Sequence, residues 1–184
     1  MLESLAASAL GGFCAKVADE CADRRLPLPS IIPISLAILY GALIGWLTSY
    51  TLLSSLFIAL ALASLLSGKI NHPYHLLGAA VFTLVLVAFP TIAFEPWLFC
   101  LFLVSGLLDE LELGGMARGP LAFLNSERLW TPLAALLAVL FLGAPLLFLL
   151  ALVLFDITYR FGGWVVALEY PPKPVRAPAR RRKR

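Results

Sequence analysis

Ionisable side chains gather in four segments of this sequence, and each segment borders a long apolar stretch. The segments cover residues 16–25, 69–75, 109–128 and 156–160. A charged group at the centre of a membrane helix costs about 2.5–3.5 kcal/mol on insertion scales, so such groups face a cavity or one another. The sequence therefore predicts that the four segments meet at one face, and that any chemistry takes place there.

Carboxylates in two of these segments are candidates for binding Mg²⁺. Asp19 and Asp23 follow Lys16 at helical spacing, and Asp109 and Glu112 share a helix face after a later apolar stretch. Mg²⁺ binds one or two carboxylates together with phosphate oxygens and water. We predict Asp19, Asp23, Asp109 and Glu112 as metal ligands.

The segment 69–75 combines a cation with two imidazoles. Lys69 can bind a phosphate as a point charge, and His72 or His75 can carry a proton near neutral pH. We predict both histidines as catalytic groups. Anchoring of the chain at a membrane interface is an alternative role for the same side chains.

Asp156 directly follows the apolar run 146–155, which contains no polar residue, and Arg160 lies four residues later. The guanidinium of Arg160 is suited to bidentate recognition of phosphate, and Asp156 is suited to moving protons. We predict Asp156 as a catalytic group, and Arg160 with Lys16 and Lys69 as substrate-binding groups.

The same charges also fit an ordinary structural interpretation. Lys16 with Glu20, and Glu20 with Arg24, are spaced as i, i+4 pairs on a helix, each contributing about 0.2–0.5 kcal/mol. Asp156 and Arg160 have the same spacing and can shield each other as an internal salt bridge. Neighbouring Lys and Arg residues can neutralise the carboxylates without a metal.

The composition places these segments in a membrane protein. Of 184 residues, 61% are hydrophobic and 14% are charged, with a mean hydropathy of +0.93. Soluble domains average about 45–50% apolar and about 25% charged residues. The three cysteines show no CxxC spacing and are expected to be packing residues. The absence of Gln and the abundance of Arg and Pro are typical of a thermophilic source.

The apolar stretches predict an all-α, polytopic bundle of about six membrane helices, with five as the alternative. The clearest span is Ile31–Tyr50, which has no formal charge and contains Gly41 and Gly45 at a spacing that permits close helix packing. Further spans are predicted over 52–67, 76–94 and 96–108. The block 129–155 is either one long helix or two helices broken at 143–145, of which the first is short and suits a partial span.

A break at 143–145 returns the C-terminus to the side that holds the other basic residues, which the positive-inside tendency places in the cytoplasm. Glu95 is then the only formal charge expected on the opposite side. Residues 2–17 are predicted as an interfacial helix, and Gly162 and Gly163 as the end of the last helix. We expect residues 1–170 to form one domain of a multi-pass cell-membrane protein. A disordered, basic, cytoplasmic tail that contacts anionic lipid headgroups is expected over 171–184.

Three functions fit this pattern. The first is a Mg²⁺-dependent membrane enzyme, a transferase or phosphatase, acting on a phosphorylated isoprenoid or glycerolipid. The second is a small ion- or proton-coupled transporter or channel with broken spans at Pro90 and 143–145, and the third is a non-catalytic subunit of a membrane complex. The basic tail lacks the aromatic residues of a nucleic-acid module, so no specific nucleic acid is expected, whereas a homo-oligomer is compatible with the sequence.

Overall fold

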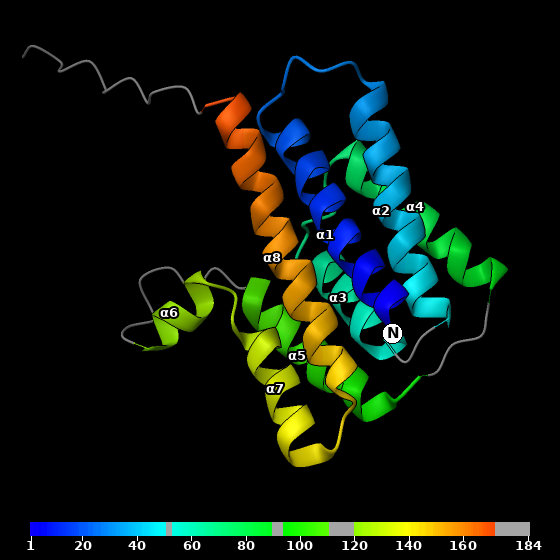
Figure 1. Ribbon diagram of the computed structural model, residues 1–184, viewed down its shortest axis with the longest axis vertical. Helices are drawn as coiled ribbons and strands as arrows, with labels where there is room; N and C mark the ends of the chain where they lie inside the picture. The colour runs from blue at the N-terminus through cyan, green and yellow to red at the C-terminus, as the bar shows by residue number, and fades with distance from the viewer. Residues whose placement is uncertain (51–52, 90–93, 111–119, 172–184) are drawn as a thin grey trace, which may run out of the picture.

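Helices account for all regular structure in the described part of the chain. A computed structural model describes residues 1–50, 53–89, 94–110 and 120–171. The predicted all-α class is confirmed for these residues. The helices, shown in Figure 1, are α1 (Leu2–Asp23), α2 (Ile31–Tyr50), α3 (Ser54–Leu66), α4 (Pro73–Ala88), α5 (Pro96–Glu110), α6 (Pro120–Ser126), α7 (Trp130–Leu142) and α8 (Leu146–Glu169).

The break predicted at 143–145 is present. Gly143 ends α7 with φ +69°, a left-handed conformation that favours glycine, and Pro145 precedes the first turn of α8. The two helices therefore run in opposite directions, and α8 runs back past the start of α7 and continues well beyond it (Figure 1). The single-helix alternative for 129–155 is wrong.

The prediction that Gly162 and Gly163 end the last helix is wrong, because α8 continues to Glu169. Both glycines face α1 and allow it to approach closely. A Cβ on Gly162 would lie 3.1 Å from the carbonyl oxygen of Phe13, and one on Gly163 would lie 3.1 Å from Cε of Lys16. The glycines therefore serve helix packing here, and residues 156–160 lie in the interior of a long helix.

Helix α1 lies along α8 and α2, whereas the sequence predicted an interfacial helix. Ser8 Oγ donates a hydrogen bond of 2.7 Å to the carbonyl oxygen of Ala151, and Thr158 Oγ1 donates one of 2.6 Å to that of Ala9. Ser8 is fully buried. Residues further along α1 contact residues further along α8, from Ser8 with Ala151 to Lys16 with Gly163. The two helices therefore run in the same direction.

Helices α2 and α4 pack through small residues. A Cβ on Gly41 would meet the backbone carbonyl of Gly78, and a Cβ on Gly78 would meet the ring of Tyr40. A Cβ on Gly45 would lie 2.8 Å from Cβ of Val85. The close approach permitted by the Gly41 and Gly45 spacing is therefore realised.

The apolar core lies among α3, α5, α7 and α8. The rings of Phe102 and Phe148 stack at a centroid distance of 5.7 Å, and Leu56 and Ala135 are fully buried beside them. At the far end of this core the hydroxyl of Ser55 donates to the carbonyl oxygen of Glu95. These contacts hold the shorter helices against the lower half of α8 in Figure 1.

The charges divide unevenly between the two ends of the bundle. Glu3 begins α1, at the same end as the start of α8, and Glu95 precedes α5 at that end. The expectation that Glu95 alone is charged there therefore misses Glu3. Among the described basic residues, Arg24 donates to the carbonyl oxygen of Tyr170 at the opposite end of α8, and Arg160 lies in the interior of that helix beside Asp156.

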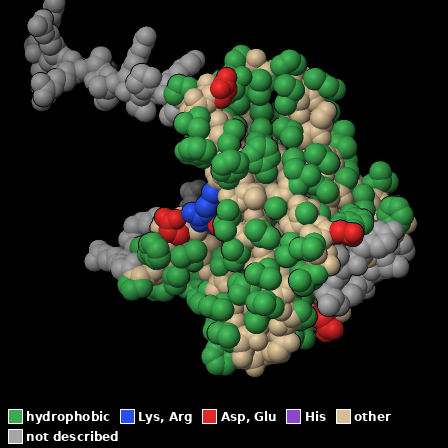
Figure 2. Space-filling model, viewed as in Figure 1, with side chains coloured by type: hydrophobic (Ala, Val, Ile, Leu, Met, Phe, Trp, Pro, Cys, Tyr) green, Lys and Arg blue, Asp and Glu red, His purple; other side chains and the backbone are tan. Residues whose placement is uncertain are grey.

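Two of the described helices are long and apolar enough to cross a membrane. They cover Ile31–Ser49 and Leu146–Glu169. The other apolar helices, α3, α4 and α7, have 13, 16 and 13 residues, below the usual range of about 17–25. Two such helices support an association with membranes, while the six-span bundle is not confirmed. Figure 2 shows a face on which hydrophobic side chains predominate along the length of the molecule.

Candidate functional site

Ionisable side chains from separate helices meet between the middle and the C-terminal end of α8, and we call them the ionic layer. They form an α1 group around Asp19, a cavity group around Glu110 and an α8 group around Arg160. On the face in Figure 2 the blue and red atoms beside the middle of α8 interrupt an otherwise largely apolar surface. The layer consists of Lys16, Asp19, Glu20, Arg24, Lys69, His75, Asp109, Glu110, Glu127, Arg128, Asp156, Tyr159 and Arg160.

Asp19 is the centre of the α1 group. Its Oδ2 accepts hydrogen bonds from Lys16 Nζ at 3.0 Å and from the Tyr159 hydroxyl at 3.1 Å. Its Oδ1 lies 3.2 Å from His75 Nε2. The side chains come from α1, α4 and α8, so Asp19 links three helices. These contacts bring segments 16–25, 69–75 and 156–160 together, as the sequence predicts.

The pKa of Asp19 is lowered despite its partial burial. Burial alone raises the pKa of a carboxyl, but the hydrogen bonds from His75 and Lys16 and the positive charge of Lys16 outweigh that effect and hold it below its ordinary range. Asp19 is therefore an anion at neutral pH. Its negative charge is compensated by protein groups.

Glu20 supports the structural interpretation of the first segment. It is 8% exposed and pairs with Lys16 at 2.9 Å and with Arg24, the two i, i+4 pairs expected from the spacing. Asp23 lies one turn further along and is exposed at the end of α1. The two carboxylates Asp19 and Asp23 therefore lie in different environments.

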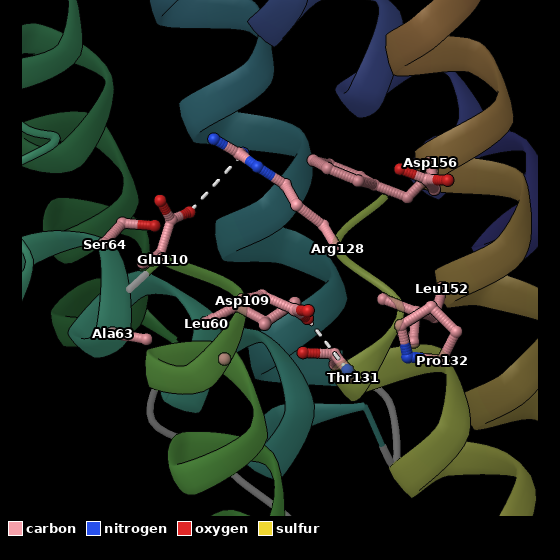
Figure 3. Close-up of a pocket in the computed structure, with 12 residues that line it drawn as sticks. Leu60, Ala63, Ser64, Asp109, Glu110, Arg128, Thr131, Pro132, Leu152 and Asp156 are labelled. Carbon is pink, nitrogen blue, oxygen red and sulfur yellow. Dashed lines mark hydrogen bonds and ion pairs between the residues drawn. The ribbon is translucent and has the colours of Figure 1, made fainter. Parts of the chain in front are cut away.

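The cavity group surrounds a small cavity between α3, α5, α7 and α8, drawn in Figure 3. Its volume is about 110 Å³, with Ala63, Gly106, Leu152 and Phe155 on its apolar side. Asp109, Glu110, Arg128, Thr131 and Asp156 supply the polar side. Apolar and polar walls thus face each other at the edge of the core.

Glu110 is held loosely at this cavity. Its Oε1 lies 3.6 Å from Arg128 Nη1, and its Oε2 lies 3.9 Å from Lys69 Nζ. Both distances are longer than a hydrogen bond. The carboxylate is 14% exposed, while the guanidinium of Arg128 is 51% exposed. The pair therefore joins a buried anion to a cation that reaches the surface.

Asp109 has a structural role. Its two carboxylate oxygens accept hydrogen bonds of 2.8 Å from the backbone N–H groups of Trp130 and Thr131, at the first turn of α7. An anion is favoured there because the first N–H groups of a helix lack partners and the helix dipole is positive at that end. Both oxygens predicted to bind a metal are thus engaged by the backbone.

We expect Asp109→Ala to destabilise the protein by about 1–2 kcal/mol, the usual cost of losing a helix cap. The measurement is thermal unfolding in detergent. Ser126→Ala is the control, because the hydroxyl of Ser126 makes an exposed hydrogen bond within its own helix α6. Equal unfolding temperatures for the two variants would contradict a capping role for Asp109.

The α8 group is built on an internal salt bridge. Arg160 Nε donates to Asp156 Oδ2 at 2.9 Å, as the i, i+4 spacing indicates. Its two Nη atoms donate to a carboxylate oxygen and to the carbonyl oxygen of Glu127, at 3.1 Å and 2.7 Å. Arg160 is 50% exposed, so part of its guanidinium reaches the surface despite these bonds.

The remaining predicted residues are not gathered into the layer as metal ligands. His72 caps α4, with its Nδ1 accepting from the backbone N–H of Tyr74 at 3.5 Å, and Glu112 lies outside the described residues. Within the part of the chain that the structure describes, no three His, Cys, Asp or Glu residues form a group that can hold a metal ion. The predicted ligands Asp19, Asp23 and Asp109 lie in three separate environments.

Sequence reasoning missed the roles of Tyr159, Thr131 and Arg128. Tyr159 lies between Asp156 and Arg160 and turns to a different helix, α1. The sequence feature that could have revealed this role is the presence of a polar aromatic residue in the middle of an apolar helix. Thr131 and Arg128 flank the start of α7, and no local spacing relates them to Glu110, which they meet across the cavity.

No family model, curated protein or solved structure matches this chain. Its function is therefore inferred from the fold and the ionic layer.

Proposed function

We propose that this protein is a multi-pass membrane protein that binds a phosphorylated lipid at the ionic layer, from the side where its basic residues gather. The observation that carries the proposal is that Arg128, a half-exposed guanidinium, lines a cavity in an otherwise apolar helical bundle, with a second half-exposed guanidinium, Arg160, nearby. Arg128 and Arg160 are linked through Glu127, which precedes Arg128 in the chain and binds Arg160. Planar guanidiniums are well suited to phosphate.

The position of the layer supports a lipid as the bearer of the phosphate. Exposed apolar side chains lie beyond it along α8, including Phe161, Trp164 and Leu168, and along α2, including Ile31 and Leu39. Large exposed apolar surfaces mark contacts with membranes or partners. A ligand at the ionic layer would therefore meet charge and apolar surface together, as a lipid headgroup and its chains require.

A Mg²⁺-dependent reaction on this lipid is the catalytic form of the proposal. Both oxygens of Asp109 are engaged by the backbone, whereas Asp156 accepts from Arg160 through Oδ2 and is 38% exposed beside the cavity. Asp156 is therefore the more accessible of these two carboxylates. A metal that enters with the substrate phosphate needs only one or two protein carboxylates. Mg²⁺-dependent turnover of a lipid phosphate, lost in Asp156→Asn, would support this form, and turnover unchanged in that variant would exclude it.

Binding of short-chain phosphatidic acid to the purified protein in detergent tests the proposal. We expect Arg128→Gln to weaken binding about ten-fold or more, because charge-assisted contacts contribute about 1.5–3 kcal/mol. Arg25→Gln is a matched control, since Arg25 is exposed and both arginines have positive φ, 48° and 53°. No measurable binding, or equal loss in both variants, would contradict the proposal.

Proton-coupled transport is the second candidate, and the contact of His75 with Asp19 favours it. The α1 group joins an imidazole, a carboxylate, an amine and a phenol across three helices, as proton relays in membranes do. In proteoliposomes a pH gradient would then dissipate through the wild type and persist with His75→Gln. Equal rates for empty liposomes and wild-type proteoliposomes would exclude this function.

A further inference from the structure

The cavity beside Glu110 carries polar atoms that lack hydrogen-bond partners among the described residues. Thr131 is 3% exposed, and its Oγ1 lines the cavity without a partner. Glu110 Oε2 is also buried and makes no hydrogen bond, since Lys69 Nζ lies 3.9 Å away. A buried polar atom left unpaired is unfavourable, because it has given up its hydrogen bonds to water without replacing them. The two atoms indicate that a donor from outside these residues belongs in the cavity.

The charge of the cavity wall indicates what kind of donor this is. Three carboxylates line the cavity, those of Asp109, Glu110 and Asp156, against the single guanidinium of Arg128 (Figure 3). Asp109 is satisfied by the backbone of α7 and Asp156 is paired with Arg160 at 2.9 Å, whereas Glu110 has only ion pairs at 3.6 Å and 3.9 Å. A cationic group with N–H donors complements this wall better than an anion or an apolar group.

The size and the neighbours of the cavity limit the ligand further. About 110 Å³ is available, whereas one water needs only about 10–15 Å³, so the cavity has room for a small headgroup. Arg128 lies at the same cavity and reaches the surface. A phosphate bound there would carry a short amino-alkyl group into the cavity, and the apolar wall at Leu152 and Phe155 would contact its methylene groups.

Resting on the proposed function, we infer that the lipid is one whose phosphate carries a primary amine, and that Glu110 and Thr131 bind its ammonium group. The ammonium donates to Glu110 Oε2 and Thr131 Oγ1, two buried atoms of cavity-lining residues that have no hydrogen-bond partner among the described residues. A quaternary amine has no N–H to donate, so a site built for hydrogen bonds would discriminate against it.

Short-chain phosphatidylethanolamine, phosphatidylcholine and phosphatidic acid of equal chain length, titrated into the full chain in detergent, test the inference. We expect the wild type to bind the ethanolamine lipid at least about ten-fold more tightly than the choline lipid. Thr131→Val and Glu110→Gln should each reduce that preference several-fold. Thr131→Ser should keep it, because serine retains the hydroxyl.

The controls separate this inference from the proposed function. Thr83→Val is matched to Thr131→Val, since Thr83 lies on the exposed side of α4 with its hydroxyl bonded within that helix, and it should leave the preference unchanged. If phosphatidic acid binds but ethanolamine and choline lipids bind equally, the cavity holds only water and the inference fails while the proposed function stands. If none of the three binds more tightly than a phosphate-free diacylglycerol, both fail. A preference unaltered in both Thr131→Val and Glu110→Gln would place the amine elsewhere and overturn the inference.

Discussion

Gly78→Leu is expected to destabilise the protein more strongly than the loss of the Asp109 helix cap. A Cβ at Gly78 already meets the ring of Tyr40, and the carbonyl of Gly78 itself lies where a Cβ on Gly41 would be. The obstacle is the ring of Tyr40, whose hydroxyl donates to the carbonyl oxygen of Tyr74. Either this ring must leave its place between the helices or α2 and α4 must separate. Overpacking usually costs about 1–3 kcal/mol, and we expect at least about 3 kcal/mol for this substitution.

Thermal unfolding and size-exclusion chromatography in detergent measure this effect. Ala80→Leu is the matched control, because Ala80 is exposed on the same helix α4 and accepts a larger side chain without a clash. We expect Gly78→Leu to aggregate or to unfold at a much lower temperature, and Ala80→Leu to resemble the wild type. Similar unfolding of the two variants would mean that α2 and α4 do not pack through Gly41 and Gly78.

Asp19→Asn is expected to have the second largest effect on stability. The change removes the negative charge between Lys16 and His75, and removing one partner of a buried pair costs about 3–5 kcal/mol. We expect about 3 kcal/mol, the lower end of that range, since the side chain of Asp19 remains 22% exposed. Asp23→Asn is the matched control, with an exposed carboxylate on the same helix, and should change the free energy of unfolding little.

The same comparison gives a pH dependence with a defined sign. The pKa of Asp19 is lower in the folded protein than the value of about 3.9 for an unfolded chain. Its contribution to stability is therefore complete above about pH 5 and is lost as the pH falls through the folded pKa. The difference in unfolding temperature between wild type and Asp19→Asn should narrow in acid. A difference that stays constant from neutral pH to about pH 3 would contradict the lowered pKa.

Much of the helical architecture follows from local patterns in the sequence. The helix Ile31–Tyr50 has the predicted bounds, and the break at Gly143 is recognisable because glycine and proline stand together in an apolar run. Helix α4 begins earlier than predicted because His72 caps it and Pro73 occupies its first turn, where proline is tolerated. Helix α6 is absent from the sequence prediction, because it lies within a polar stretch without a long apolar pattern.

The errors concern contacts between elements that are distant in the sequence. Gly162 and Gly163 are a typical end of a helix when α8 is taken alone, but the presence of α1 makes them a packing surface. Asp109 is a typical exposed acid at the end of a helix until the N-terminus of α7 lies against it. Periodicity does not contain this information, because it describes one helix at a time.

The candidate site shows the same division. Sequence reasoning brings the segments of Lys16, His75 and Asp156 to one layer, since each borders an apolar helix and must avoid lipid. It also predicts the ion pairs of Glu20 with Lys16 and of Arg160 with Asp156, because in each pair the partners are four residues apart on one helix. The cavity at Glu110 and Thr131 depends on how α5 and α7 cross, so it required the three-dimensional structure.

The central claim is that the ionic layer binds a phosphorylated lipid. Photo-crosslinking in liposomes tests it most directly. The probe is phosphatidic acid with a diazirine on the acyl carbons nearest the phosphate, and the labelled residues are identified by mass spectrometry. We predict labels on α8 around Leu152 and Phe155 and on α3 around Leu60, reduced by excess phosphatidic acid and by Arg128→Gln. Labels spread evenly over the exposed apolar faces of α2 and α4, and unaffected by competitor, would contradict the claim.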